Sequence, residues 1–177
     1  MKRSLCLIAL GVLAACSDRA SDTPATEPSI AAAVADPDAT VVALFEPYTR
    51  EYRQDDPADW DRPIYTPAVR QLIETWKQGF NDEEVADLQD FGWLCECQDW
   101  DEKTFNATVQ PHPAPANGRV EVPVEVAIGW DEVRSARYAL VLDDGRWLVD
   151  DVRSEAFPDG LQAALRQAIA NMTPGAA

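Results

Sequence analysis

The first half of the chain carries hydrophobic residues at helical spacing. Between residues 36 and 54 they recur at Val41, Leu44, Phe45, Tyr48 and Tyr52. This period predicts a helix, because positions three and four apart share one helix face. Pro47 falls inside the pattern and lacks the N–H that a helix interior requires. We therefore expect either a kink near Ala43 or two short helices.

A second helix is predicted to begin after a loop of acids and prolines. Thr66 and Pro67 are residue types preferred at a helix cap and at the first helical position. The apolar face of this helix comprises Val69, Leu72, Ile73, Trp76 and Phe80. Gly79 and Asn81 predict its end, and residues 82–89 form a candidate third helix.

From residue 101 onward the hydrophobic period changes from helical to alternating. A short alternation over residues 105–109 predicts one strand, and a longer one from Val120 to Trp130 predicts a second with one face in the core. Pro123 removes a hydrogen-bond donor from the second strand. We therefore expect that strand at the edge of its sheet, or a bulge at Pro123.

Two further strands are predicted at residues 133–142 and 146–152, on either side of Asp144 and Gly145. This dipeptide favours a two-residue type I′ turn. The pattern closes with a helix over about 158–170, whose apolar stripe comprises Leu161, Ala164, Leu165, Ala168 and Ile169. Helices, then antiparallel strands, then a terminal helix predict an α+β fold.

The turn also predicts a register between its two strands. Leu142 then faces Trp147, Leu140 faces Val149 and Tyr138 faces Asp151. An acid on such an apolar face would have a raised pKa, because desolvation disfavours its charged form. Tyr138, Trp147 and Asp151 are therefore a candidate pocket with a general base. In the alternative, Asp151 is solvated or caps the next segment.

Residues 1–15 have the pattern of a processing signal. Lys2 and Arg3 precede an apolar run that is too short to span a bilayer. Small residues then precede Cys16, and this arrangement resembles a bacterial lipobox. The resemblance implies that Cys16 is lipidated and holds the protein on the periplasmic face of the envelope. Ser17, in place of Asp, follows the cysteine, and its resemblance to lipoprotein sorting signals favours the outer membrane over the inner one. The alternative is an ordinary secretory signal that is cleaved near Ala15.

The composition after the signal divides the chain into a tether and a domain. Residues 16–35 are rich in small and polar residues without a period, which predicts a disordered tether. Residues 36–177 are long enough for a single domain with a core. The chain has 31 acids, 15 Lys and Arg, and a net charge of −16. We therefore expect no nucleic acid partner, whereas a basic envelope protein or a small cationic ligand is compatible. The same charge also serves solubility alone.

Besides the anchor Cys16, Cys95 and Cys97 are the two cysteines that remain after processing. An oxidising compartment favours a disulfide between them. Their Cα atoms on a straight strand would lie about 6.5 Å apart, near the upper limit for a disulfide, so the backbone must bend. A redox role stays open, as does a zinc site formed with Asp99 and His112. The single residue between the cysteines disfavours zinc.

Acids surround the cysteine pair, and Asp99, Asp101 and Glu102 form a candidate acidic cluster. Carboxylates bind cations and act in acid–base catalysis. These acids lack the regular spacing of a calcium loop, however, which favours a solvated loop. We expect no metal and no cofactor.

Several short motifs together resemble the DUF3828 family of small bacterial lipoproteins, in the NTF2-like superfamily. They are Tyr65-Thr66-Pro67 with Leu72-Ile73, Leu94-Cys95, Gln98-Asp99, and the run from Gly145 to Val152. The resemblance covers about residues 41–169. It implies a cone in which N-terminal helices pack on a curved antiparallel sheet that is followed by a C-terminal helix. The family brings no established activity.

Two hypotheses of function follow from these observations. The first is a non-catalytic periplasmic binding module, in one version an acidic inhibitor or immunity-like protein that covers a basic envelope enzyme. The alternative is a small pocket enzyme of the NTF2-like superfamily that uses Asp151 and Tyr138. Buried acids in a closed pocket would favour the enzyme, and an exposed acidic or aromatic patch would favour the binding module.

Overall fold

The computed structural model describes residues 36–51, 53, 55–79 and 88–172. The predicted signal, the predicted anchor Cys16 and the predicted tether up to residue 35 lie outside the described residues. Phe80, Asn81 and most of the candidate third helix lie outside them as well. Within the described ranges, no helix has the length and hydropathy that are needed to cross a bilayer.

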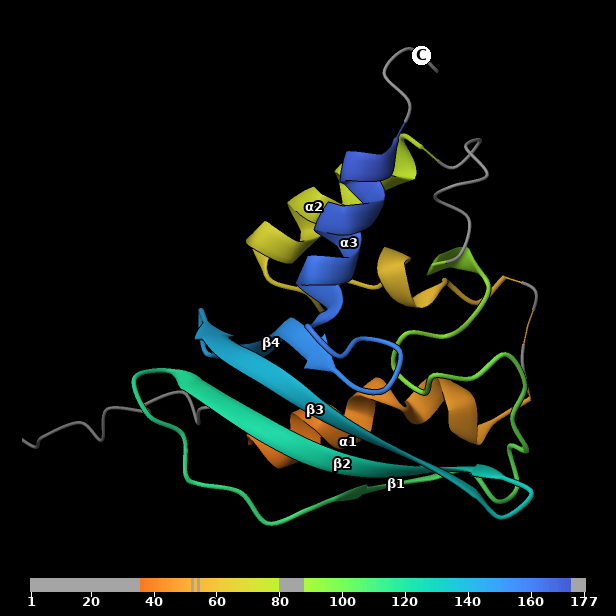
Figure 1. Cartoon of the computed structure of the whole chain (residues 1–177). Coiled ribbons are helices and arrows are strands. Elements are labelled where there is room, and N and C mark those ends of the chain that lie inside the picture. The colour runs from red at the N-terminus through yellow and green to blue at the C-terminus, as the bar shows by residue number, and fades with distance from the viewer. Residues whose placement is uncertain (1–35, 52, 54, 80–87, 173–177) are drawn as a thin grey trace, which may run out of the picture. The chain divides into compact units, whose positions relative to one another are not determined.

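Four strands form an antiparallel sheet at the centre of the described domain (Figure 1). They are β1 (Asn106–Val109), β2 (Arg119–Gly129), β3 (Glu132–Asp143) and β4 (Arg146–Arg153), and they pair in this order. Helix α1 (Pro37–Leu44) packs against β1 and β2, while α2 (Pro67–Lys77) and α3 (Leu161–Asn171) pack against each other and against β4. This arrangement confirms the predicted α+β class.

Pro47 divides the first predicted helix into two short ones. Helix α1 ends at Leu44, and a 3-10 helix, η1 (Glu46–Thr49), follows with Pro47 in its first turn. A proline is tolerated there because the first N–H groups of a helix have no partner within it. The prediction of two short helices is confirmed.

Thr66 caps α2 as the sequence predicts. Its hydroxyl accepts from the backbone N–H of Val69 at 3.5 Å, and Pro67 is the first helical residue. The segment before the cap runs along the free edge of β4. Thr66 donates its N–H to the carbonyl of Val149 at 2.9 Å, and Val149 donates to the carbonyl of Ile64 at 2.8 Å. The cap residue thus joins the helix to the sheet.

The inner face of the sheet supplies a large part of the core. Its buried residues on β2 and β3 alternate as predicted: Val120, Val122, Val124, Val126, Ile128, Ala136, Tyr138 and Leu140. Full burial of one large apolar side chain contributes roughly 1.5–3 kcal/mol. Trp76 and Trp93 are also fully buried, and they extend this core toward the helices.

The prediction for Pro123 is wrong. Its strand β2 lies between β1 and β3, and the bulge on β2 falls between Ala127 and Gly129. The proline is tolerated because the last residue pair between β1 and β2 is Val109 with Val124. Pro123 therefore lies just beyond the pairing with β1. The carbonyl of Pro123 accepts from Gln110 at 2.9 Å, so its missing N–H faces the end of β1 and interrupts no pairing with β3.

The prediction that Trp130 continues the buried face of β2 is also wrong. Trp130 and Asp131 form the two-residue turn between β2 and β3, and the Trp130 side chain is 66% exposed. The irregular pairing before Gly129 and the positive φ of both turn residues end the alternation. The turn therefore carries Trp130 away from the core.

Candidate binding groove

A surface groove of about 510 Å³ lies between the 3-10 helix η1, a second 3-10 helix η2 (Asp59–Asp61) and the loop that holds the cysteines. Residues of four segments line it: 47–48, 56–60 with Arg62, 89–92, and 97–100 with Glu102. Its aromatic lining residues are Tyr48, Trp60, Phe91 and Trp100, and its charged ones are Asp56, Asp59, Arg62, Asp90, Asp99 and Glu102. The groove is thus bounded by aromatic rings and contains five acids and one base.

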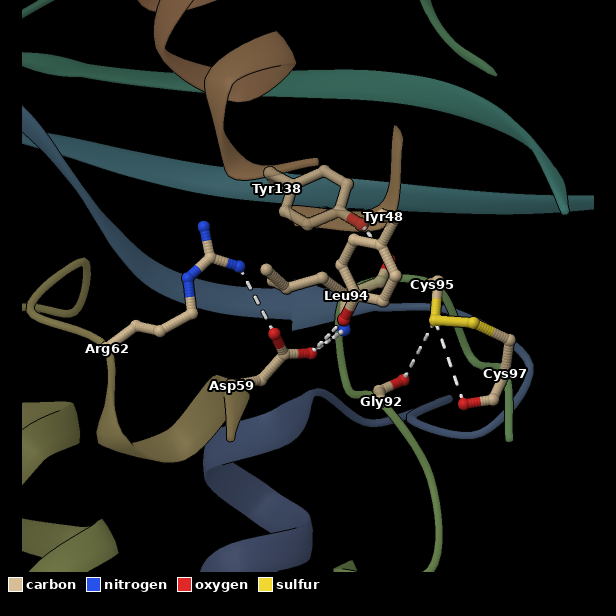
Figure 2. The surroundings of a disulfide bond; sticks show 8 residues. All are labelled: Tyr48, Asp59, Arg62, Gly92, Leu94, Cys95, Cys97 and Tyr138. Atoms are coloured by element: carbon tan, nitrogen blue, oxygen red, sulfur yellow. Dashed lines mark hydrogen bonds and ion pairs between the residues drawn. A yellow bond between two sulfur atoms is a disulfide. The ribbon is translucent and has the colours of Figure 1, made fainter. Parts of the chain in front are cut away.

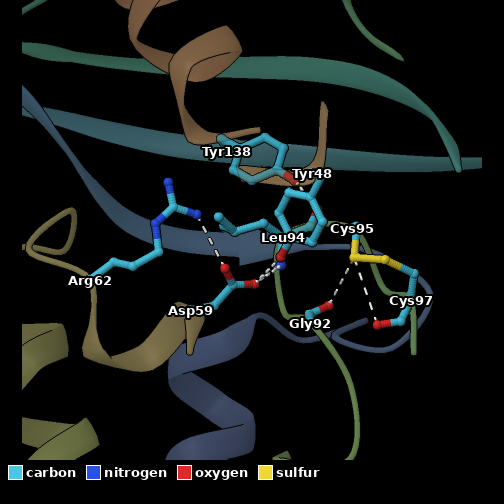
Figure 3. Close-up of polar contacts among 8 residues, drawn as sticks. All are labelled: Tyr48, Asp59, Arg62, Gly92, Leu94, Cys95, Cys97 and Tyr138. Carbon is cyan, nitrogen blue, oxygen red and sulfur yellow. Dashed lines mark hydrogen bonds and ion pairs between the residues drawn. A yellow bond between two sulfur atoms is a disulfide. The ribbon is translucent and has the colours of Figure 1, made fainter. Parts of the chain in front are cut away.

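Asp59 lies in the groove wall, in the 3-10 helix η2 (Asp59–Asp61), and is only 7% exposed. One of its carboxylate oxygens accepts from the Tyr48 hydroxyl at 2.6 Å and from the backbone N–H of Leu94 at 3.0 Å. The other accepts from Arg62 at 3.2 Å (Figure 3). A buried carboxylate persists in a protein when it is paired and hydrogen-bonded in this way.

The electrostatics of this network keep Tyr48 protonated. The pKa of Tyr48 is raised well above its ordinary value of 10. Burial is the largest cause, and the negative charge of Asp59 is the second. The hydroxyl therefore remains a donor to Asp59 at any physiological pH. Because Tyr48, Leu94 and Arg62 all donate to this one carboxylate, the Asp59–Tyr48–Arg62 network serves as a fixed structural unit.

Cys95 and Cys97 form a disulfide in the loop beside this network (Figure 2). Their Cα atoms are 5.1 Å apart, because Glu96 between them adopts a left-handed backbone with φ of 52°. This is the bend that the short spacing predicts. The loop closes on itself where Gly92 donates its N–H to the carbonyl of Cys97 at 2.8 Å.

Leu94, at the centre of the disulfide loop, is held from both sides. Its N–H donates to Asp59, and its carbonyl accepts from the buried hydroxyl of Tyr138 at 2.5 Å. Gly92 permits this close packing, because a Cβ there would lie 2.8 Å from the Tyr48 hydroxyl and 2.9 Å from the sulfur of Cys95. The sheet and the 3-10 helices thus fix the loop that forms one wall of the groove.

The aromatic walls of the groove continue the core. The rings of Trp100 and Tyr48 meet edge to face with their centroids 5.0 Å apart, and the ring of Tyr48 stacks on that of Phe105 with a centroid distance of 5.2 Å. The ring centroid of Trp60 lies 5.5 Å from that of Trp76 and 5.4 Å from that of Trp93. Such contacts hold Trp60 and Trp100 in place even though each is only half-buried.

The predicted acidic cluster is divided between two roles. Asp99 and Glu102 line the groove. Asp101 does not; its carboxylate accepts from the backbone N–H of Lys103 at 3.1 Å and from the Thr104 hydroxyl at 3.0 Å, which stabilises the turn before β1. Only two members of the cluster therefore belong to the candidate site.

Asp56 and Asp90 complete the acids of the groove. Asp56 is paired with Arg50 at 2.7 Å, and the hydrogen bond from this guanidinium lowers the pKa of Asp56 to about 2. Asp90, Asp99 and Glu102 make no ion pair within the described part of the chain. The groove therefore presents three acids whose charge is not balanced by a neighbouring base.

The predicted pocket of Tyr138, Trp147 and Asp151 is not formed. Leu142 pairs with Trp147 and Leu140 with Val149 as predicted, but a bulge between Ala139 and Leu140 shifts the register by one residue. Val152 consequently faces Tyr138, and Asp151 pairs with Ala139. This change removes the base from the candidate enzyme site.

Asp151 instead caps the last helix, which is the alternative that the sequence left open. Its carboxylate accepts from the backbone N–H of Gln162 in the first turn of α3 at 3.0 Å, and from its neighbour Val152 at 3.1 Å. Tyr138 and Trp147 are buried packing residues, 0% and 6% exposed. None of the three residues lines the groove.

The zinc alternative is wrong as well. Cys95 and Cys97 are bonded to each other, and Nε2 of His112 lies 2.8 Å from the carboxylate of Asp38 in α1. Within the described residues, no group of three or more His, Cys, Asp or Glu side chains is arranged to hold a metal ion.

Sequence reasoning missed the central members of the site: Tyr48, Asp59, Arg62 and Gln89. Asp59 stands in a loop with Asp55, Asp56 and Asp61, and no local feature distinguishes it from them. The aromatic residue beside it, Trp60, is the only signal that this part of the loop is packed against the domain.

No family model matches the sequence, and no curated protein matches it. Among solved structures, the chain is similar to the type VI native effector-immunity complex Tae3-Tai3 from Ralstonia pickettii. The TM-score is 0.46 and the identity 13%, over 68% of this chain and 95% of that one. It is also similar to a phospholipid-binding protein from Ralstonia solanacearum, with a TM-score of 0.37 and 16% identity, over 77% of this chain and 63% of that one. Similarities of this size carry no inference about function.

Proposed function

We propose that this protein is a non-catalytic binding module of the periplasmic envelope whose groove receives positively charged side chains of a basic partner protein. In the same proposal, Cys16 carries the lipid anchor, and the domain is a member of the NTF2-like superfamily with its cone-shaped fold. The lipobox resemblance supports the location, and the order of helices and strands supports the fold.

The observation that carries the proposal is the charge and chemistry of the groove. Asp90, Asp99 and Glu102 have no basic partner among the described residues, and Trp100 and Tyr48 stand beside them. Acids and aromatic faces together attract ammonium and guanidinium groups through ion pairs and cation–π contacts. Arg62 is the only base among the described residues that line the groove; Asp59 neutralises it, so it does not oppose a cationic ligand.

A second feature favours a peptide over a simple ion. The side-chain nitrogen of Gln89 is buried in the groove wall, and nothing in the described residues accepts its hydrogen bond. A buried donor without a partner costs free energy, and a ligand carbonyl would restore the bond. A peptide that carries Lys or Arg supplies both the carbonyl and the cation.

Catalysis has less support from the same residues. Asp59 is the buried carboxylate of the groove, and Tyr48, Leu94 and Arg62 occupy its oxygens. A general base must lie within hydrogen-bond reach of a substrate proton, whereas Asp59 is buried and already accepts from three donors. Asp151, which the enzyme hypothesis required, is engaged at the start of α3.

Calorimetric titration of the purified domain tests the proposal. The probe is a blocked peptide of alternating glycine and arginine, and the same peptide with glutamate in place of arginine is the negative probe. We expect saturable binding of the arginine peptide only, with an affinity that falls as salt rises. Glu102→Gln should weaken binding several-fold.

Asp143→Asn is the matched control, because it removes the same charge from an exposed position outside the groove. It should leave the affinity for the arginine peptide unchanged. If the two variants weaken binding equally, attraction by net charge alone explains the result and the groove is not the site. Absence of saturable binding would refute the proposed function.

A further inference from the structure

We propose that the tip of the β2–β3 hairpin, formed by Trp130 and Val133, is a second contact for the same basic partner protein. The docking surface then extends from the groove to this tip. The inference rests on the proposed function, since it concerns a second part of the surface that the partner covers.

Exposure is the first observation. Trp130 is 66% exposed and Val133 is 56% exposed, and the third large exposed hydrophobic residue of the described chain is Val42 at 48%. Two of the three thus lie three positions apart on one hairpin. Exposed aromatic residues are enriched among the residues that dominate protein–protein binding energies. The tip therefore has the composition of a contact site.

The backbone of the tip is the second observation. Trp130 and Asp131 have φ of 52° and 63°, a left-handed conformation that glycine and asparagine adopt at the lowest cost. The β3–β4 hairpin uses the favoured pair Asp144-Gly145, with φ of 46° and 77°. A bulky residue at such a position is strained, so neither packing nor turn formation explains Trp130.

The tip is continuous with the rim of the groove. A Cβ on Gly129 would lie 2.8 Å from the Cβ of Asp101, and Asp101 donates its N–H to the carbonyl of Ile128 at 2.9 Å. Asp101 stands between Trp100 and Glu102, which both line the groove. Figure 1 shows the β2–β3 turn beside the loop that leads into β1. A partner that fills the groove therefore lies within reach of Trp130.

Charge identifies the kind of partner. Asp131 and Glu132 are exposed beside Trp130, and Asp99 is exposed on the adjoining loop. Arg134 pairs with Glu132 and leaves the other two acids without an ion pair in the described structure. Acids beside the tryptophan oppose insertion into an anionic membrane surface. They suit a protein with an apolar pocket that is bordered by Lys and Arg.

Photo-crosslinking of the full chain in its native host tests the inference. The photoreactive residue p-benzoylphenylalanine replaces Trp130 at the tip, Asp99 at the groove rim, or Val42 on α1 as the exposed apolar control. We expect positions 130 and 99 to label the same protein, one with a net positive charge, and position 42 not to label it. The labelled protein is then purified for affinity measurements.

In those measurements Trp130→Asn should weaken binding at least about tenfold, because exposed tryptophans that anchor an interface have effects of this size. Val42→Asn should leave the affinity unchanged. Asparagine suits the left-handed turn, so Trp130→Asn should melt no lower than the wild type, and lost binding cannot then be ascribed to unfolding.

The outcomes separate this inference from the proposed function. One outcome is that position 99 labels a basic protein but position 130 does not, because position 130 labels lipid, a second copy of the chain or nothing at all. In that case the inference is wrong and the proposed function stands. Labelling of a basic protein from 130 alone contradicts the shared surface. If neither position labels a basic protein, both proposals fail. An unchanged affinity in Trp130→Asn would also overturn the inference.

Discussion

The backbone N–H of Leu94 donates to the buried carboxylate of Asp59, 35 residues earlier in the chain, at 3.0 Å. The Tyr48 hydroxyl donates to the same oxygen, and Arg62 pairs with the other one. This carboxylate therefore holds together η1, η2 and the disulfide loop. The shape of the groove depends on it, because these three segments form its walls.

Asp59→Ala should destabilise the domain by about 3–5 kcal/mol, because it leaves Arg62 and two other buried donors without a partner. Urea unfolding measures the change. Asp61→Ala is the control. Asp61 pairs with Lys77 at 2.8 Å but is 44% exposed, and loss of such a surface pair costs no more than about 1 kcal/mol. Equal losses in the two variants would contradict a structural role for Asp59.

The two hairpin tryptophans should respond in opposite directions. Trp147 is 6% exposed opposite Leu142, and Trp147→Ala should cost about 3–5 kcal/mol, because it leaves a cavity in the core. Trp130→Asn should instead stabilise the domain by up to about 1 kcal/mol, through relief of left-handed strain. Thermal melts of both variants check the pair. A clear loss of stability in Trp130→Asn would mean that its ring packs on the domain in solution.

Asp151→Asn distinguishes a helix cap from a pocket base. Asparagine keeps an acceptor for the N–H of Gln162 but loses the negative charge at the start of α3. We expect a loss of at most about 1 kcal/mol, from the weaker interaction with the helix dipole. Chemical unfolding at neutral pH measures it. A gain in stability would indicate that Asp151 is a desolvated acid after all.

Glu96 gives the loop a dependence on pH. Burial raises the pKa of Glu96 above its ordinary value of 4.5, against the opposing hydrogen bond from the N–H of Ala156 at 3.1 Å. The folded state therefore holds this proton more tightly than the unfolded state. Stability falls as pH rises from 4.5 through the folded pKa.

Glu96→Gln removes this penalty and keeps the acceptor for Ala156. It should be more stable than the wild type at about pH 7 and equal to it at about pH 4, where the wild-type carboxyl is largely protonated in both states. Paired melts across this range measure the difference. Glu155→Gln is the control, since Glu155 is an exposed acid near Glu96, and its effect should be smaller. A difference that is constant with pH would be inconsistent with a desolvated Glu96.

Cys16→Ser tests the proposed anchor. Without the thiol no lipid is attached, so the protein should move to the soluble fraction or keep residues 1–15. Fractionation and intact-mass measurement of the purified protein decide between anchoring and ordinary secretion. Unchanged membrane association of the variant, with normal processing, would refute lipid attachment at Cys16.

The sequence by itself determined the elements whose signals are local. Thr66 and Pro67 begin α2 because the cap bond to Val69 spans three residues. Asp144 and Gly145 form the turn between β3 and β4 because both accept a positive φ. Pairing close to that turn, between Leu142 and Trp147, follows directly from it. Interactions of this range depend on neighbouring residues alone, so they can be predicted without the fold.

For the candidate site, the sequence indicated Asp99, Glu102 and the cysteine pair but not Asp59 or Tyr48. The loop of Asp59 contains other acids, and selection among them depends on Leu94, 35 positions away. Tyr48 was expected as one more apolar residue of a helix, and its role as a donor exists only beside Asp59. Contacts over such separations are decided by how the segments pack.

The tertiary structure likewise decided the place of Asp151. A regular register from the turn would set this acid against the buried Tyr138, where desolvation of its charge is costly. The bulge at Ala139 and Leu140 places Val152, which is 0% exposed, in that position and lets Asp151 reach the first turn of α3. Local signals determined where the strand pairing begins. The far end of this pairing was decided by the burial of Val152 and the position of α3. Both exist only in the folded chain.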